Sequence, residues 1–166
     1  MEPCEKVLIF TLAGLRCALP LGEIEKIHRA VEISPIPKAP ANVLGLINIH
    51  GQIVPVLNIR RLLHLAEVDI DVNDHFILTR TRRRLVAIPV DNVLGLFEQV
   101  PSDVIAPDDL LLGTGFLHGV TRLEDDILFL YDLDKVLTSD DFAKISQCLH
   151  EIEQTSTHPE TAKEEL

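Results

Sequence analysis

The sequence is poor in aromatic side chains. It has no tryptophan and one tyrosine, and aromatic residues make up 4% of its 166 residues. Aromatic rings form the surfaces on which nucleic-acid bases and flat cofactors stack. We therefore expect no cofactor. The apolar residues, 46% of the chain, are mostly leucine, isoleucine and valine, which predicts an aliphatic core.

Cysteine and long apolar runs are also scarce. The three cysteines, Cys4, Cys17 and Cys148, are odd in number and far apart, which fits reduced thiols better than a disulfide framework or a zinc site. No apolar run approaches the roughly 18 to 20 residues of a membrane helix. The start, Met1 to Lys6, lacks the basic and then apolar layout of a signal peptide. We expect a cytoplasmic protein without direct membrane insertion.

Positive charge is in deficit, since 15 lysines and arginines face 26 acidic residues and give a net charge of −11. Such a charge repels phosphate backbones and anionic lipids. The exception is the turn Arg80–Arg84, which suggests an alternative function as a small β-barrel nucleic-acid-binding module. Because no aromatic residues are interleaved and the whole chain is acidic, a solvated turn or a charged protein contact is favoured. No nucleic-acid partner is expected.

Sequence motifs of enzymes are missing as well. The chain has no G-x-S-x-G, no phosphate-binding P-loop, no G-x-G-x-x-G and no H-E-x-x-H. Its seven histidines show no metal-ligand spacing. Gly113-Thr114-Gly115 lacks the third glycine of a dinucleotide site and is interpreted as a loop. The sequence predicts a non-enzymatic binding module with no catalytic, cofactor-binding or metal-binding residues.

Many short apolar runs separated by turn residues predict a mainly β fold. Strands are expected over 7–12, 16–19, the two sides of His50–Gln52, 76–79, 85–90, 92–97, 115–120 and 127–131, the last two across an Asp125-Asp126 turn. The segment 21–27 fits a helix by spacing and a strand by its β-branched residues, and both remain open. A helical turn is expected over 59–63. Ser139 is a candidate N-cap for a helix whose apolar residues recur at helical spacing.

The length fits one domain with one core. We expect residues 1–153 to form this single domain. Residues 154–166 are polar and acidic, with no apolar face to bury, and are expected to be a disordered tail. The C-terminal helix could pack on its own domain or exchange between two copies, and the sequence favours neither.

The passage from Asn42 to Arg60 resembles the signature of the CheW family, G-x-x-N-x-R-G-x-x-x-P-x-x-D-L-R. Gly45, Asn48, Gly51, Pro55 and Arg60 occupy the matching positions. The resemblance extends over about Lys6 to Glu151. Within the signature, His50 stands in place of the arginine and Asn58 in place of the aspartate.

The resemblance implies two SH3-like five-stranded β-barrel subdomains, intertwined in one domain, with short helices and a C-terminal helix. It also implies an adaptor that couples chemoreceptors to a CheA-type histidine kinase, through the kinase regulatory domain and the cytoplasmic tip of the receptor. Lys26 stands where many relatives have an acid. Together with His50 and Asn58, this charge change suggests a divergent or alternative-pathway paralogue.

Eight residues are candidates for protein binding by the resemblance: Ile24, Lys26, Leu44, Gly45, Leu46, Asn48, His50 and Arg60. Each except Lys26 has a competing interpretation. Turn and edge positions demand glycine for backbone reasons, isoleucine and leucine fit a core, and an asparagine can brace a turn. Arg60 could be an internal ion-pair partner, and His50 could project as a contact. Burial distinguishes these alternatives.

Overall fold

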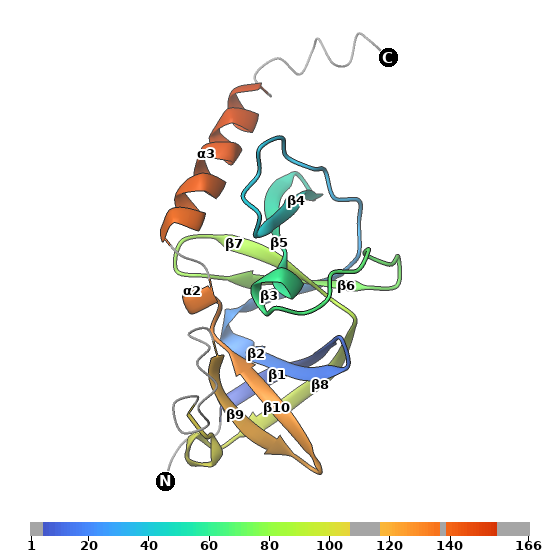
Figure 1. Ribbon diagram of the computed structural model, residues 1–166, viewed down its shortest axis with the longest axis vertical. Coiled ribbons are helices and arrows are strands. Elements are labelled where there is room, and N and C mark those ends of the chain that lie inside the picture. Colours follow the sequence, from blue (N-terminus) through green and yellow to red (C-terminus); the bar gives the residue numbers. More distant parts are fainter. Residues whose placement is uncertain (1–4, 107–116, 137–138, 156–166) are drawn as a thin grey trace.

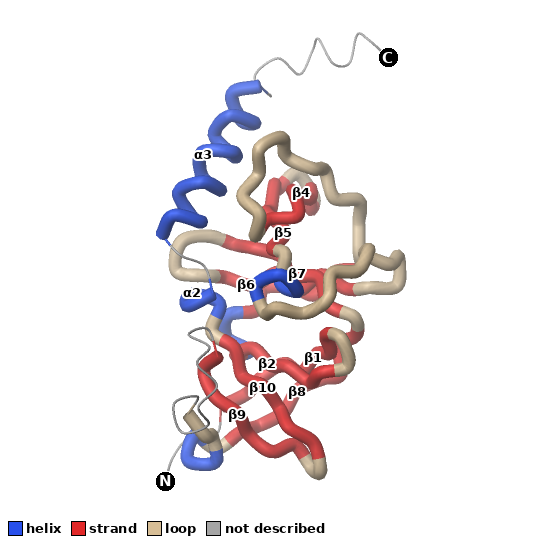
Figure 2. The backbone as a smooth tube through the Cα atoms, viewed as in Figure 1, coloured by secondary structure: helices blue, strands red, loops and turns tan. Residues whose placement is uncertain are grey.

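The computed structural model describes residues 5–106, 117–136 and 139–155, and these form two five-stranded sheets that lie one above the other along the long axis (Figure 1). The described helices are α1 (Ile59–Leu62), α2 (Leu133–Val136) and α3 (Ser139–Thr155), with short 3-10 turns at Leu21–Glu23 and Pro101–Asp103. None of the described helices is long and apolar enough to cross a membrane. The expected mainly β fold is confirmed, and Figure 2 shows how strands dominate it.

The first sheet has the strand order β8-β1-β2-β10-β9. Its strands are β1 (Glu5–Leu12), β2 (Leu15–Pro20), β8 (Asn92–Gln99), β9 (Leu117–Leu123) and β10 (Asp126–Tyr131). The hairpin of β1 and β2 turns through Ala13 and Gly14, whose φ angles are 51° and 80°. Two positive φ angles match the right-handed twist of a two-residue hairpin. The strands expected over 7–12 and 16–19 are therefore joined by a tight two-residue turn.

The second sheet has the order β3-β6-β7-β5-β4. Its strands are β3 (Ile24–Arg29), β4 (Val43–Ile49), β5 (Gln52–Leu57), β6 (His75–Arg80) and β7 (Leu85–Val90). The chain starts the first sheet, builds all five strands of the second, and then returns to finish the first with β8, β9 and β10. This order interlaces the two sheets, and β2 meets β10 in parallel.

The sheets are not closed into barrels, which corrects the finer part of the expected fold. Within the described ranges, the two outer strands of each sheet, β8 and β9 or β3 and β4, do not pair with each other. The second sheet is nevertheless curled, because Ser34 after β3 forms a bridge to Leu46 in β4. This bridge consists of two backbone hydrogen bonds, whereas closure into a barrel would need a continuous ladder of bonds between two strands.

The largest apolar cluster lies between the sheets and beneath α3. The first sheet contributes Leu8 and Phe10, the second Ile77 and Val86, and α3 Phe142, Ile145 and Leu149. A smaller cluster belongs to each sheet: Ile47 and Phe76 are in that of the second sheet, and Ile9 and Leu128 in that of the first. Burial of these aliphatic side chains is the main stabilising contribution.

Two local expectations are settled or corrected, and one helix is new. The open segment 21–27 is a 3-10 turn followed by strand, because β3 adds to the edge of the second sheet through pairs such as Ile27 with Ile77. The last hairpin turns at Glu124 and Asp125 rather than at Asp125 and Asp126, since Asp126 already pairs with Leu123. Helix α2 was not expected.

Some expectations fall partly outside the described residues. The loop Gly113–Gly115 and the start of the strand expected over 115–120 lie there, as does residue range 156–166 of the expected tail. The described part of the tail, Gln154 and Thr155, belongs to α3. The expected helix is thus confirmed, and it runs through the tail's first two residues.

Candidate functional site

Of the eight candidate residues, three are exposed. Lys26 lies in the edge strand β3, Asn48 near the end of β4, and His50 in the turn between β4 and β5. An exposed lysine on an edge strand is available to a partner and also discourages unwanted strand pairing. These three are therefore the candidates that a partner protein can reach directly.

A histidine that the sequence analysis did not single out joins Lys26 to His50. His28 follows Lys26 by two residues in β3, so both project from the same face of the strand. The His28 ring lies 6.4 Å from the His50 ring, edge to face. We call Lys26, His28 and His50 the histidine face. The i, i+2 spacing of Lys26 and His28 in a strand could have predicted that these two share a face. The position of His50 next to His28 depends on the curl of the sheet, which the sequence does not show.

Asn48 holds the turn that presents His50. Its side-chain Oδ1 accepts a hydrogen bond of 2.8 Å from the Gly51 backbone amide. His50 and Gly51 both have positive φ, 50° and 87°, a conformation that a local side-chain bond of this kind helps to stabilise. Asn48 thus acts on the turn from within, although its side chain is exposed.

Gly45 and Leu46 lie inside the fold. A Cβ atom at Gly45 would overlap the Ser34 carbonyl oxygen and the Ile33 side chain. This close approach allows the two backbone bonds between Ser34 and Leu46, at 2.8 and 2.9 Å. The Leu46 side chain is buried in the main core. Glycine is therefore required here for the packing of the backbone.

Ile24 and Leu44 are half-buried. Ile24 packs against the cluster between the sheets, and Leu44 against the cluster of the second sheet. Both side chains therefore have a packing role, which accounts for their apolar character without a partner.

Arg60 forms an internal ion pair. Its Nη2 lies 2.6 Å from Asp91 Oδ1, and the arginine side chain is only 14% exposed. The other Asp91 oxygen accepts a bond from the Ala13 amide in the first hairpin. Arg60 also donates to the Ala66 carbonyl at 3.3 Å. Arg60, the last residue of the signature, thus links α1 through Asp91 to the first hairpin of the first sheet.

Asn58, which replaces the family's aspartate, caps α1. Its Oδ1 accepts a bond from the Arg61 amide at 3.2 Å, as expected of an N-cap. Its Nδ2 donates to the Glu67 carboxylate. An aspartate could make the first bond but not the second, so the amide is suited to its acidic neighbour.

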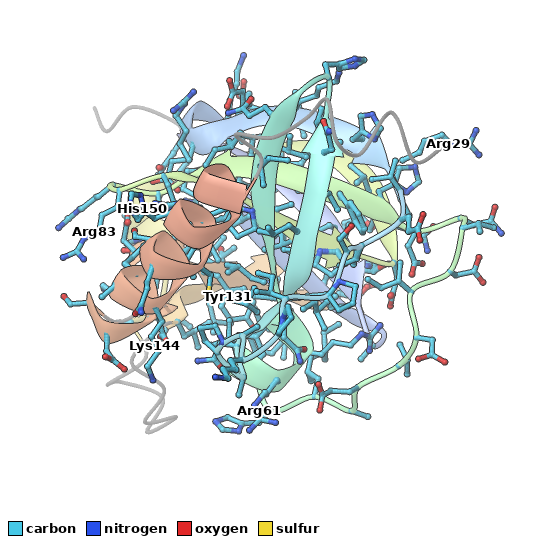
Figure 3. All side chains as sticks on the ribbon, turned by 90° about the horizontal axis from the view of Figure 1, so that it is seen from above. Arg29, Arg61, Arg83, Tyr131, Lys144 and His150 are labelled. Carbon is cyan, nitrogen blue, oxygen red and sulfur yellow. The ribbon has the colours of Figure 1, made fainter. Side chains whose placement is uncertain are left out.

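The arginine turn is engaged with the C-terminal helices. The Arg82 amide donates to Asp134 of α2 at 2.8 Å, and Arg84 donates to Ser146 of α3 at 2.9 Å. The Arg83 guanidinium lies 5.1 Å from the centre of the Phe142 ring, and Figure 3 shows Arg83 beside α3. The cluster therefore serves as a clasp for these helices.

The buried thiol of Cys17 is not activated as a nucleophile. Burial raises the pKa of Cys17 to about 12, despite an opposing side-chain bond with Tyr131. Burial likewise raises the pKa of Tyr131. Both groups are therefore neutral near pH 7 and serve packing. In the part of the chain that the structure describes, no three acidic, histidine or cysteine side chains are grouped to hold a metal ion.

The sequence matches a family model described as CheW-like domain over residues 6–141. This covers most of the chain, and the chain belongs to the CheW-like domain family. The region contains both sheets except Glu5 of β1, together with α1, α2 and the first three residues of α3.

Similar proteins and a similar structure agree with this assignment. The chain is 26% identical over 147 residues to "Chemotaxis protein CheW" of Treponema pallidum (strain Nichols), covering 85% of this chain and 86% of the relative. It is 26% identical over 106 residues to "Protein FrzA" of Myxococcus xanthus, covering 64% and 66%. The crystal structure of scaffolding protein TtCheW from Thermoanaerobacter tengcongensis superposes with a TM-score of 0.75 at 20% identity, covering 85% of this chain and 96% of that one. This last likeness concerns the fold.

Proposed function

We propose that the chain is a non-enzymatic scaffold of bacterial chemosensory signalling that couples chemoreceptors to a CheA-type histidine kinase. Family membership supports this role, because relatives carry the name chemotaxis protein CheW. The structure supports it through exposed side chains at a turn that a hydrogen bond from the Gly51 amide to Asn48 braces.

The observation that carries the proposal is the histidine face. Lys26 is a solvent-exposed cation on an edge strand, His28 follows it by two residues on the same face of that strand, and the His28 ring lies 6.4 Å from the His50 ring. We infer that this face meets the kinase regulatory domain or the receptor tip. A lysine in place of the acid of many relatives reverses the charge that such a partner must present, so the partner is expected to be a divergent paralogue with an acidic contact.

A second exposed feature is the free edge of the first sheet. Leu94 and Leu96 on β8 are 53% and 60% exposed, and among the described strands β8 pairs only with β1. Unpaired strand edges with apolar side chains suit sheet-to-sheet contacts. We propose that this edge contributes a second contact, which a scaffold that joins two partners requires.

The scaffold would affect signalling by holding geometry. A coupler that binds two states of a kinase equally well shifts neither population. We therefore propose that the chain binds one kinase state more tightly than the other, and that it does so in the cytoplasm.

The test is a pull-down of the purified regulatory domain of a CheA-type kinase from the same cell, and of the receptor tip. Lys26→Glu should reduce binding to one of them by about tenfold, which corresponds to one lost charge pair. His50→Arg restores the family residue and should strengthen binding to a receptor tip of the usual kind. Lys6→Glu is the matched control, because Lys6 is an exposed lysine on the other sheet.

Equal effects of Lys26→Glu and Lys6→Glu would show that net charge, not the histidine face, controls binding. Failure to bind any such kinase or receptor would reject the coupler role. Salt-sensitive retention on immobilised nucleic acid would instead favour the alternative function. The contacts of the arginine turn with α2 and α3 give that alternative no support.

A further inference from the structure

A cavity of about 190 Å³ opens at one end of the first sheet. It is lined by Glu5, Val7, Ala18, Pro20, Glu23, Gln99, His118, Leu130, Tyr131 and Asp132. All five strands of this sheet contribute, because β1 and β9 begin here and β2, β8 and β10 end here. The cavity is thus part of the sheet's construction, and none of the interactions proposed for the scaffold role uses it.

The cavity has an apolar floor and an acidic rim. Val7, Ala18 and Leu130 belong to the apolar cluster of the first sheet. The carboxylates of Glu5, Glu23 and Asp132 stand around them. Within residues 5–106, 117–136 and 139–155, no lysine or arginine forms an ion pair with any of these three carboxylates.

An unpaired buried acceptor is the second observation. Gln99 is 5% exposed and lines the cavity. Its Nε2 donates to Glu5 Oε2 at 3.1 Å, which commits the donor end of the amide. Its Oε1 has no hydrogen-bond partner. A buried amide oxygen without a donor is unfavourable. The oxygen is closed to water in this conformation, so a ligand N–H group would reach it, and satisfy it, once the Gln99 side chain turns toward the cavity.

The electrostatics point to the same kind of ligand. Burial raises the pKa of Glu23, and the nearby carboxylates of Asp132, Asp134 and Glu5 raise it further. The carboxylates therefore gather negative charge at this rim, where His118 is the one basic residue among the lining residues. A metal ion does not suit the site, since these groups do not converge closely enough in the described chain to hold one.

We propose that this cavity binds a small aliphatic ammonium compound, whose methylene groups cover the Val7–Leu130 floor and whose ammonium groups bond to the rim carboxylates and the Gln99 amide oxygen. The volume is below the range of about 300 to 1,000 Å³ that holds drug-sized ligands, so a short diamine is of suitable size. An ammonium group carries only donors, which matches the carboxylate and amide oxygens of the lining.

The experiment titrates 1,4-diaminobutane into the full chain by calorimetry or by amide chemical shifts at pH 7. The compound should saturate one site and shift amides of β1, β8 and the 3-10 turn Leu21–Glu23. The neutral isostere 1,4-butanediol and Mg²⁺ are the comparison ligands, and neither should produce this pattern. If the diamine shows no saturable binding, or if Mg²⁺ reproduces its shifts at equal concentration, the proposal is wrong.

Three variants locate the site. Glu23→Gln and Gln99→Leu should each weaken diamine binding by about tenfold, the effect of one charge-assisted hydrogen bond. Glu32→Gln removes the same charge from an exposed loop residue and should leave affinity unchanged. Gln99→Leu also removes the unpaired buried oxygen. Because that oxygen is unfavourable in the free protein, its loss should not lower the free energy of unfolding. If Glu32→Gln weakens diamine binding by the same factor, the diamine is attracted by the net charge of the protein and not by this cavity, and the proposal is wrong.

Acidification gives an independent test. Because the pKa of Glu23 is raised, its carboxylate becomes protonated at a higher pH than an ordinary glutamate as the pH falls. Diamine affinity should therefore decline at a pH above the usual glutamate range, and this early decline should be absent in Glu23→Gln. Glu5, His118, Tyr131, Asp132 and the nearby Asp134 are present in both proteins, so the comparison isolates the contribution of Glu23. An unchanged pH profile in the variant would contradict the role given to Glu23.

Discussion

Arg60 shows how one side chain of a signature can serve the fold rather than a partner. Its guanidinium is largely buried and pairs with Asp91, whose second oxygen holds the Ala13 amide of the first hairpin. Removing either member leaves the other partly buried without its partner, and that penalty exceeds the worth of an exposed pair.

We predict that Arg60→Ala lowers the free energy of unfolding by about 2 kcal/mol. Asp91→Ala should cost a similar amount, because it also releases the Ala13 amide. Urea denaturation of both single variants and the double variant measures the coupling. Strict additivity of the two losses would show that the pair contributes nothing as a pair.

Asn58 illustrates a substitution that depends on its neighbour. The family's aspartate would retain the bond to the Arg61 amide but would face Glu67, to which Asn58 now donates. Two carboxylates at this distance repel each other, and one would have to bind a proton.

We predict that Asn58→Asp lowers stability by about 1 kcal/mol at pH 7, although it restores the family residue. The loss should vanish when Glu67→Gln is combined with it, since glutamine can donate to the new carboxylate. Thermal unfolding of the two variants tests this. A stabilised Asn58→Asp protein would show that Glu67 moves away at no cost.

At the scale of elements, α3 is attached by an apolar stripe and an arginine clasp. Phe142, Ile145 and Leu149 are buried between α3 and the sheets. Arg83 covers the Phe142 ring and Arg84 bonds to Ser146. The helix thereby closes the open side of the main core.

We predict that Phe142→Ala lowers the free energy of unfolding by about 3 kcal/mol, as for other large side chains removed from cores. Lys144→Ala is the control on the same helix: Lys144 is exposed and pairs only with Asp140 one turn earlier, which is worth about 0.5 kcal/mol at most. Hydrogen exchange should increase along α3 in the first variant alone. Equal effects of both would mean that α3 is not docked through Phe142.

Elements set by local pattern could be predicted from the sequence, and elements set by distant partners could not. The turn at Ala13 and Gly14 and the start of α3 follow from neighbouring residues. Ser139 is the first residue of α3 and not the N-cap that was expected. The state of 21–27 depended on pairing with β6, and α2 is too short to show a period. The histidine face could not be predicted from the sequence, because His28 and His50 come together only through the curl of the second sheet. Likewise, composition alone could not show that the arginine turn clasps α3.

At the scale of the whole molecule, the two sheets differ in how far apart their strands lie in the sequence. The second sheet is built from the consecutive strands β3 to β7, whereas the first joins β2 to β10 across most of the chain. Long-range pairing closes a large loop before it gains contacts, and it slows folding.

We predict that the second sheet forms earlier on the folding pathway. Ile47 and Ile9 are buried in the separate clusters of the second and first sheets, so Ile→Val at each removes the same methylene group, at about 1 kcal/mol. In stopped-flow chevron plots, Ile47→Val should mainly slow refolding and Ile9→Val should mainly speed unfolding. The opposite assignment would place the nucleus in the first sheet.

The interlaced order also matters while the chain is being made on the ribosome. The first hairpin emerges before the other described strands, and its neighbours β8 and β10 emerge only after the second sheet has been synthesised. Until then both of its edges and its apolar faces lack their final cover, and exposed edges of this kind promote aggregation. The nascent hairpin is therefore the part of this protein for which a chaperone that binds short apolar strands would matter most.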